Sequence, residues 1–239
     1  MLAKLPTALL LAAIAPVAPA GRAGGASPPA ELRYVVFLRP DPARKPLPVE
    51  ERQRIMSAHM ANISSLARDG VLVAAGPMED KEVTISGIFV FNSPSLAEAC
   101  RVAALDPTVT AGRNTVDVHP WLGPAGIGTS YFLWKRQNPA GQDQMASHAF
   151  CIVKRGPAWI PTVPDDGEHE EFVESLRTAG KLAAAGPIEG DADMLGIVIF
   201  KGASLDDART ALEADPPVRT GELSVEYHVW WTADKILPW

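Results

Sequence analysis

Two kinds of hydrophobic pattern follow one another along the chain, and their succession predicts alternating strands and helices. The run 32–38 is rich in β-branched and aromatic residues, as is typical of a buried strand. A helical stripe follows, in which apolar side chains and one histidine recur every three to four residues: Ile55, His59, Ile63 and Leu66. Gly70 stands where the end of a helix favours a left-handed residue. A strand and an amphipathic helix therefore open the folded part of the chain.

The elements that follow complete a recognisable unit. Two apolar runs, 71–75 and 85–91, are joined by a polar turn and predict two paired strands. Ser95 is suited to cap a short helix that ends near Asp106, because Asp106 precedes a proline and is disfavoured in the α region. A last strand is predicted over 115–121. The predicted order is β-α-β-β-α-β.

The same order recurs about 110 residues later. The segment Gly70 to Glu79 aligns with Gly180 to Glu189 at an offset of 110, which also aligns His59 with His169. After one deletion the offset is 109, and these pairs match: Ser95 with Ser204, Asp106 with Asp215, Gly112 with Gly221, His119 with His228 and Trp121 with Trp230. Ordered matches with a single gap indicate an internal duplication.

The duplicated order predicts an α+β fold made of two tandem ferredoxin-like units. Each unit has one antiparallel sheet with two helices on one face, so its other face needs a covering partner. We expect the two sheets to face each other as an intramolecular pseudo-dimer. The predicted units occupy 31–123 and 147–239, with a linker over 124–146 that is rich in glycine and proline. Within the linker, the run 131–134 is too apolar for a free connection, and the sequence leaves open whether it is an additional strand.

The N-terminus has the composition of a signal peptide. Lys4 precedes an apolar run over 9–14, and Ala18-Pro19-Ala20 has the small residues of a signal-peptide cleavage site. The run is short and interrupted by proline, although a retained membrane anchor is the alternative. We predict a signal peptide over 1–20, a flexible lead-in over 21–30 and a secreted or periplasmic protein.

Composition narrows the class of partner. The chain is 47% hydrophobic and 21% charged, which is typical of a globular protein, and its formal net charge is −6. Because no cluster of lysine and arginine stands out, we predict no nucleic-acid partner and no membrane insertion after signal cleavage. Cys100 and Cys151 lie at non-equivalent places in the two units, so we expect two buried free thiols.

Four residues are candidates for proton-transfer chemistry. His59 and His169 belong to the apolar helical stripes, so we expect them to face the sheet. An imidazole can transfer a proton near neutral pH, above all when an aspartate fixes one of its ring nitrogens. Asp106 and Asp215 would be those aspartates. The alternative is structural: a hydrogen-bonded core histidine in each unit, and an aspartate that organises the turn before a proline.

Other polar residues give weaker signals. His119 and His228 share a strand face with a carboxylate and a tryptophan, and we expect an inter-unit hydrogen-bond network there, with a metal site as the alternative. Glu79 and Glu189 fit either a solvated turn or the mouth of a pocket. The sequence has no metal-ligand spacing, phosphate-binding glycine loop or nucleophile elbow, so we predict no cofactor.

The duplicated residues resemble the YCII-related domain. The features that carry the resemblance are the helix histidine, the Ala-Gly-Pro strand end at 75–77 and 185–187, the Asp-Pro after the second helix, and the final Pro-Trp strand. The resemblance covers about 32–123 and 147–231. It implies a dimeric α/β barrel and an active-site pair, which maps to His59 with Asp106 and to His169 with Asp215. One branch of the family includes dehydrochlorinase-type enzymes of chloroaromatic breakdown.

The chain departs from the family in its predicted export and in one strand, where the second unit has Val229-Trp230 and the first has Pro120-Trp121. We predict a small-molecule pocket, with an unidentified ligand, in which a His–Asp pair in each unit performs proton transfer in an elimination or an isomerisation. The alternative is a non-catalytic ligand-binding or structural module of the envelope. A third interpretation, a haem or metal-handling protein, depends on analogy of fold.

Overall fold

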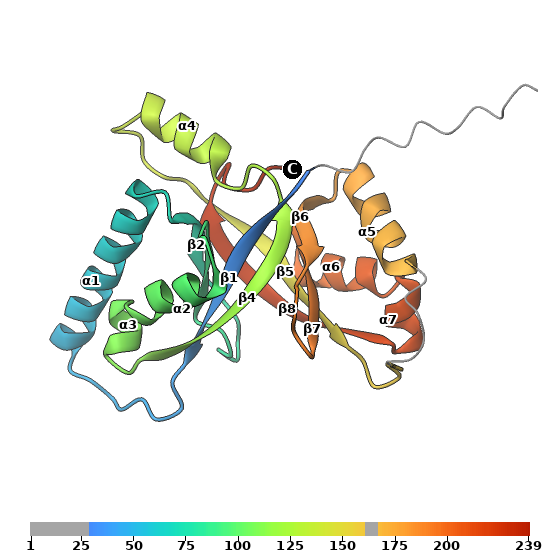
Figure 1. Ribbon diagram of the computed structural model, residues 1–239, viewed down its shortest axis with the longest axis horizontal. Coiled ribbons are helices and arrows are strands. Elements are labelled where there is room, and N and C mark those ends of the chain that lie inside the picture. The colour runs from blue at the N-terminus through green and yellow to red at the C-terminus, as the bar shows by residue number, and fades with distance from the viewer. Residues whose placement is uncertain (1–28, 161–166) are drawn as a thin grey trace, which may run out of the picture.

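The computed structural model describes residues 29–160 and 167–239, so the predicted signal peptide and most of the lead-in lie outside the described residues. Two units of similar architecture stand side by side, with their sheets in the middle and their helices outside (Figure 1). The first unit comprises β1 (Ala30–Pro40), α1 (Val49–Arg68), β2 (Leu72–Pro77), β3 (Gly87–Phe91), α2 (Leu96–Ala104), α3 (Pro107–Thr110) and β4 (Asn114–Pro124). The second comprises β5 (Met145–Arg155), α5 (Glu168–Thr178), β6 (Leu182–Pro187), β7 (Met194–Lys201), α6 (Leu205–Leu212), α7 (Pro216–Thr220) and β8 (Leu223–Ala233).

Local sequence signals account for several helix boundaries. The Ser95 hydroxyl accepts a hydrogen bond from the Glu98 amide at the start of α2, and Ser204 caps α6 in the same way. Gly70 and Gly180 follow α1 and α5 with φ of +74° and +70°, a conformation that glycine adopts without strain. The predicted caps are confirmed at these four positions.

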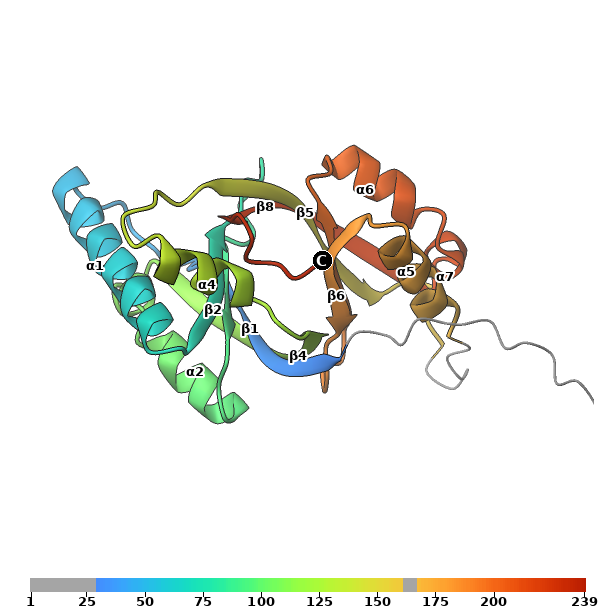
Figure 2. The ribbon, with the colours of Figure 1, turned by 90° about the horizontal axis from the view of Figure 1, so that it is seen from above.

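The connection between the units contains a helix rather than a strand. The apolar run 131–134 lies in α4 (Thr129–Gln137), which stands at one end of the barrel, close to β2 in the view from above (Figure 2). Tyr131 packs against the core between the sheets, and the Gly128 amide donates to the Ile236 carbonyl. The aromatic residues of this run therefore pack the connection onto the barrel.

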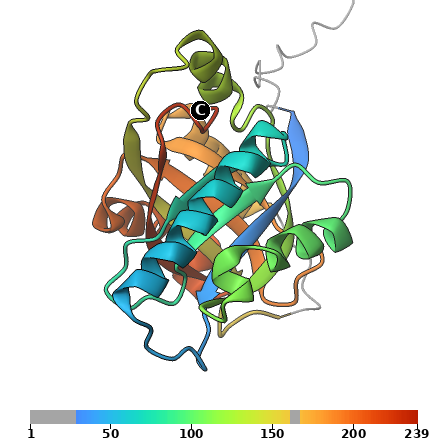
Figure 3. The ribbon, with the colours of Figure 1, turned by 90° about the vertical axis from the view of Figure 1, so that its left-hand side faces the viewer.

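The two sheets have the same strand order. The first is β2-β3-β1-β4 and the second β6-β7-β5-β8, with every pairing antiparallel. Helices α1 and α2 cross the outer face of the first sheet (Figure 3), and a buried apolar cluster fills the layer between them and the strands. A second such cluster lies between the sheet and the helices of the second unit. Both units are ferredoxin-like, as predicted.

The inner faces of the sheets share one core and form a barrel. Strand β4 meets β6 at the Trp121–Ile188 bridge, and β8 meets β2 at the Met78–Trp230 bridge. The buried cluster between the sheets draws from both units, including Phe37, Trp121, Phe150 and Trp230. The predicted intramolecular dimeric α/β barrel is therefore confirmed.

The glycine of the repeated Ala-Gly-Pro segment is explained by barrel closure. A Cβ on Gly76 would lie 1.7 Å from the Trp231 carbonyl oxygen, and one on Gly186 would lie 2.0 Å from that of Leu122. The backbone of the other unit thus passes directly over each glycine, where no side chain fits.

The cysteine prediction is half right. Both thiols are free, and Cys151 is buried in the second unit, but Cys100 is exposed because it lies on the outward face of α2. Over the described ranges, no helix is both long enough and apolar enough to cross a membrane.

Candidate functional site

The structure brings His59 and Asp106 together. Nδ1 of His59, on α1, lies 2.9 and 2.8 Å from the two carboxylate oxygens of Asp106, which precedes α3. The carboxylate is fully buried, and the imidazole is 12% exposed. The ring of Phe89 stacks on the imidazole at a centroid distance of 5.8 Å. The first His–Asp pair is therefore formed and packed between helix and sheet.

Further hydrogen bonds hold Asp106. Its carboxylate accepts from the Asn62 amide at 3.1 Å and from both the backbone amide and the hydroxyl of Thr108, at 2.9 and 2.6 Å. Asn114 donates to the Thr108 hydroxyl and accepts from Ser86, both at 3.0 Å. The aspartate thus stands at the centre of a connected polar network, which also performs the turn-organising role considered from the sequence.

The pKa of Asp106 reflects these contacts. Burial by itself would raise the pKa, because it disfavours a charged carboxylate. The hydrogen bonds from His59 and Thr108 outweigh burial and hold the pKa of Asp106 below its usual value. The carboxylate is therefore ionised and satisfied at neutral pH.

The second pair has the same contact without the network. Nδ1 of His169, on α5, lies 2.6 Å from Oδ2 of Asp215. Oδ1 of Asp215 is buried and has no hydrogen-bond partner among the described residues. Phe172 stands at the position of Asn62, and Pro217 at that of Thr108, so neither of those donors exists in this unit. The equivalent aspartates therefore differ sharply in their surroundings.

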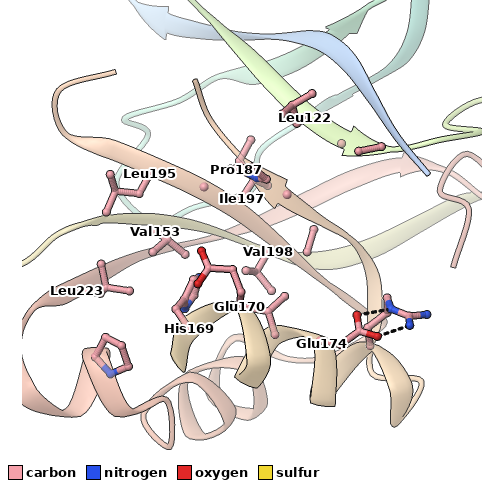
Figure 4. Close-up of a pocket in the computed structure, with 18 of the residues that line it drawn as sticks. Leu122, Val153, His169, Glu170, Glu174, Pro187, Leu195, Ile197, Val198 and Leu223 are labelled. Carbon is pink, nitrogen blue, oxygen red and sulfur yellow. Dashed lines mark hydrogen bonds and ion pairs between the residues drawn. The ribbon is translucent and has the colours of Figure 1, made fainter. Parts of the chain in front are cut away.

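A cavity of about 610 Å³ lies beside His169. It lies on the outer face of the second sheet, between α5 and the strands, and the edge of the first unit closes one side of it (Figure 4). The side chains of Val153, Val198 and Leu223 line it opposite His169. Because Asp215 engages Nδ1 of His169, Nε2 is the ring nitrogen left for a ligand in this apolar cavity.

Three differences between the units change the surroundings of His169, and the first of them, phenylalanine to valine, also makes room beside it. Each replaces a residue of the first unit by one that lines the cavity: Phe89 by Val198, Asn114 by Leu223 and Ser86 by Leu195. The strand registers support the first equivalence. Phe89 lies opposite Val36, the seventh residue of β1, and Val198 lies opposite Cys151, the seventh residue of β5. An aromatic ring and a polar network are thus exchanged for small or purely apolar side chains.

Charged groups around the cavity are mostly acidic. Glu170, Glu174 and Glu222 belong to its lining, and only Glu174 has a cationic partner there, Arg177. In Figure 4 the Glu170 carboxylate extends toward the space beside His169. These carboxylates disfavour the binding of an anionic ligand.

His119 and His228 link the two units rather than joining either His–Asp pair. Nδ1 of His119 lies 2.9 Å from Asp191 of the second unit, and Nδ1 of His228 lies 2.7 Å from Asp80 of the first. His228 also contacts Glu226 at 3.0 Å. The predicted inter-unit network is confirmed.

The pKa values of this network follow from its contacts. Burial would lower the pKa of His228, but the hydrogen bonds to Glu226 and Asp80 outweigh it and raise the pKa. The hydrogen bond from His228 lowers the pKa of Glu226 to about 2. Glu79 forms another inter-unit contact, because its carboxylate accepts from the Trp231 indole at 2.5 Å. Within the described ranges, no three histidine, cysteine or carboxylate side chains are grouped as metal ligands.

One residue of the cavity was missed at the level of sequence. Trp159, in the loop after β5, lines the cavity, and its Nε1 is buried without a hydrogen-bond partner among the described residues. The signal was a difference between the units. Arg44 stands at the corresponding place in the first unit, since its amide donates to the Asp41 carbonyl as the Trp159 amide donates to the Gly156 carbonyl. Residues that match between the units give no signal for a position at which the units differ.

Comparison with known proteins finds a family match within the first unit and a fold shared by most of the chain. Residues 32–122 match the YCII-related domain. No curated protein matches the sequence. Two chlorite dismutase variants from Candidatus Nitrospira defluvii are similar in structure, each with 11% identity and a TM-score of 0.53. The similarity covers 87% and 88% of this chain and 92% and 93% of those chains, and at such identity it concerns the fold alone.

Proposed function

We propose that the protein binds an apolar small molecule in the cavity of the second unit and that His169 and Asp215 move a proton on it. The observation that supports this most is the 2.6 Å contact between the two residues beside a cavity of about 610 Å³. His169 lines the cavity next to apolar strand residues. The reaction class is isomerisation or elimination, because both begin with removal of a proton from carbon.

In this mechanism Asp215 accepts the hydrogen bond from Nδ1–H of His169 and so fixes the tautomer whose Nε2 carries a lone pair. Nε2 removes a proton from a carbon of the bound molecule. The buried Asp215 carboxylate stabilises the imidazolium that forms, since an opposite charge in an apolar environment interacts strongly. In an isomerisation the same proton returns at a second carbon, and in an elimination a leaving group departs with its electron pair.

His59 and Asp106 have a structural role in this proposal. Asp106 already accepts hydrogen bonds from Asn62 and Thr108, and Phe89 covers the face of the His59 ring. A fully hydrogen-bonded network stabilises a core and leaves little capacity for a ligand. The proposal therefore assigns chemistry to one of the two pairs that the sequence offers.

A test that needs no knowledge of the natural ligand is deuterium exchange into a carbon acid that fits the cavity. 2-Tetralone is apolar, uncharged and has acidic protons next to its carbonyl. We expect the protein to accelerate exchange of these protons in D₂O, followed by NMR. His169→Gln should lower the protein-dependent rate by about 100-fold or more, the contribution typical of a general base.

His59→Gln is the matched control, because it removes the equivalent imidazole of the other unit. We expect it to retain the wild-type exchange rate as long as the protein is folded. Equal losses in both variants would contradict the assignment to the second unit. Binding of 2-tetralone without accelerated exchange would instead favour the non-catalytic ligand-binding module.

A second candidate function is binding of a haem-type group. The observation that favours it is Nε2 of His169, since a ligating histidine commonly donates its other nitrogen to a carboxylate as His169 does to Asp215. The acidic lining of the cavity counts against this candidate, because a haem carries two propionates. A bare metal ion has no better support, because the described residues offer no cluster of three ligands. A hemin titration tests this candidate, because ligation by His169 would give a Soret shift that His169→Gln abolishes.

We also propose that residues 147–239 are a second copy of the YCII-related domain, joined by the linker 124–146 to the copy over 31–123. The identical strand orders and the repeated Ala-Gly-Pro and Asp-Pro positions support this. Residues 1–20 would direct export, which N-terminal sequencing of protein from the periplasm or the medium would test.

A further inference from the structure

The barrel closes along two seams, one between β8 and β2 and the other between β4 and β6. Each seam has the same main-chain contact. The Glu79 amide donates to the Val229 carbonyl at 2.8 Å, and the Glu189 amide donates to the Pro120 carbonyl at 2.9 Å. Any difference between the seams therefore comes from the residues around this contact.

The seam between β8 and β2 has three further hydrogen bonds. Their donors are one backbone amide and two side chains of β8, and their acceptors belong to β2 and the turn after it. These bonds run from the Val229 amide to Asp80 at 3.1 Å, from the Trp231 indole to Glu79 at 2.5 Å, and from the Thr232 hydroxyl to the Ala75 carbonyl at 2.9 Å.

The seam between β4 and β6 cannot form these three bonds. The corresponding residues of β4 are Pro120, Leu122 and Gly123, of which proline has no N–H and the other two have no side-chain donor. One bond is gained in exchange, because the Trp121 indole donates to the Gly186 carbonyl at 3.0 Å, whereas the Trp230 indole has no partner among the described residues. The two seams of the barrel are therefore unequal, and the one between β4 and β6 is the weaker.

The weaker seam borders the cavity. Leu122 and Gly123 of β4 line the cavity, and so do Gly186 and Pro187 of β6. In Figure 4, Leu122 stands over the end of β6 at Pro187. Because the two sides of this seam belong to different units, the width of the cavity at this end depends on how closely β4 and β6 are held together.

One contact between side chains holds this seam where the other bonds are lost. Nδ1 of His119 on β4 lies 2.9 Å from Oδ2 of Asp191, in the connection between β6 and β7. The other carboxylate oxygen of Asp191 accepts from the backbone amides of Asp193 and Met194, both at 2.7 Å. Asp191 thus shapes the turn of the β6–β7 hairpin and joins it to the first unit.

We propose that His119 is a positioning residue for the cavity of the second unit. Through Asp191 it holds the β6–β7 hairpin against the end of β4, so the two walls of the cavity keep their spacing. His119 is not among the residues that line the cavity, so it acts through the wall and not on the ligand. This inference rests on the proposed function, in which the ligand occupies this cavity.

The experiment is a calorimetric titration of the full chain with 2-tetralone. His119→Gln should weaken binding by about fivefold, the size of effect typical of a residue that acts on a site through packed structure. In the deuterium-exchange assay, the 2-tetralone concentration that gives half the maximal rate should rise by about the same factor. The maximal rate should stay within about twofold of wild type, because His169 and Asp215 are unchanged.

His228→Gln is the matched control. It removes the equivalent imidazole, which lies 2.7 Å from Asp80 at the other seam, away from the cavity. We expect this variant to bind 2-tetralone within about twofold of wild type even though it loses an inter-unit contact. Equal losses of affinity in the two histidine variants would mean that general loosening of the barrel is responsible, and would overturn the role of His119.

Asp191→Asn tests the same contact from its other side and keeps the proposal testable if His119→Gln does not fold. The asparagine retains an oxygen for the amides of Asp193 and Met194 and removes the charge that faces His119. We expect about fivefold weaker binding again. The double variant should lose no more than about fivefold in total, because both changes remove one shared interaction.

Distinct outcomes separate this inference from the proposed function. Wild-type affinity in both His119→Gln and Asp191→Asn overturns the role of His119, while exchange that depends on His169 still stands. A lower maximal exchange rate with unchanged half-saturation also overturns it. Weaker binding in both variants without any accelerated exchange supports His119 and rejects the catalytic role of His169. Failure of wild type to bind 2-tetralone overturns both proposals.

Discussion

Phe89 stacks on the imidazole of His59, whereas Val198, the residue at the corresponding place in the second sheet, leaves open space beside His169. Exchange of these two side chains is the most direct test of the cavity. Val198→Phe should fill part of it and weaken binding of 2-tetralone by at least about tenfold, since this probe loses much of its buried apolar contact. Calorimetric titration of the variant measures this effect.

The reciprocal change Phe89→Val serves as the control. It should leave binding of 2-tetralone unchanged and lower the free energy of unfolding by about 2–4 kcal/mol, as expected when a buried ring is truncated. Unaltered binding in Val198→Phe would show that the ligand lies elsewhere.

The two aspartates should differ in their contribution to stability. Asp106→Asn disturbs hydrogen bonds from three residues and should lower the free energy of unfolding by about 2–4 kcal/mol. Asp215→Asn disturbs one contact and replaces a carboxylate whose buried Oδ1 has no hydrogen-bond partner among the described residues, so we expect about 1 kcal/mol or less. Urea denaturation at neutral pH compares the two, and a larger effect of Asp215→Asn would contradict the contrast between the sites.

Acid should remove the contribution of Asp106 to the free energy of unfolding. Its pKa is lowered in the folded protein, so the stabilisation is complete above the ordinary pKa of 3.8 and is lost as the pH falls through the folded value. Wild type should therefore approach Asp106→Asn in stability when urea denaturation is repeated at pH values below about 4. A constant difference down to low pH would argue against ionisation of Asp106.

The inter-unit network predicts a second pH dependence of stability, which is opposite in sign because a histidine is involved. The pKa of His228 is raised, so its stabilisation is complete below its ordinary pKa of 6.5 and is lost as the pH rises through the folded value. Glu226, with a pKa of about 2, contributes above its ordinary pKa of 4.5. The network of His228, Asp80, Glu226 and Lys154 should thus stabilise the barrel most between about pH 4.5 and 6.5.

His228→Gln isolates this effect. It should lower the free energy of unfolding by about 1–3 kcal/mol at pH 5.5 and by less at pH 9, because the charged hydrogen bonds exist only with a protonated imidazole. Chemical denaturation at the two pH values measures the difference, and an equal loss at both would refute it.

The barrel seam predicts a steric effect. Gly76→Ala and Gly186→Ala place a methyl group 1.7 and 2.0 Å from a carbonyl oxygen of the other unit, so each should destabilise the fold by at least about 2 kcal/mol. Thr115→Ala, at an exposed strand position, should stay within about 0.5 kcal/mol of wild type. Thermal unfolding compares the three, and wild-type stability of both glycine variants would mean that the strands do not meet there.

The thiols should react at very different rates. Cys100 is exposed, whereas Cys151 is buried and its burial raises its pKa to about 12. A disulfide reagent such as DTNB should modify one thiol per folded chain and both after denaturation, and the variant Cys100→Ser should lose the native-state reaction. Reaction of two thiols in the native protein would contradict the burial of Cys151.

The order and type of the elements followed from the sequence, because they depend on local periodicity and on caps such as Ser95 and Gly70. The predicted recurrence of the β-α-β-β-α-β order also led to the pairing of the sheets, since each unit alone leaves an apolar face that must be covered. The helix over 131–134 did not follow, because four apolar residues fit a strand or a helix equally well. The exposure of Cys100 depends on the rotation of α2, which local pattern does not define.

The candidate histidines and aspartates also came from the sequence, through their repetition at one register. Their distances did not, because α1 and Asp106 meet only when two helices pack on the same sheet. The difference between the two pairs was decided by tertiary structure alone. It depends on Phe89, Thr108 and Asn114 and on their counterparts Val198, Pro217 and Leu223, which are far apart in sequence and act together only through packing.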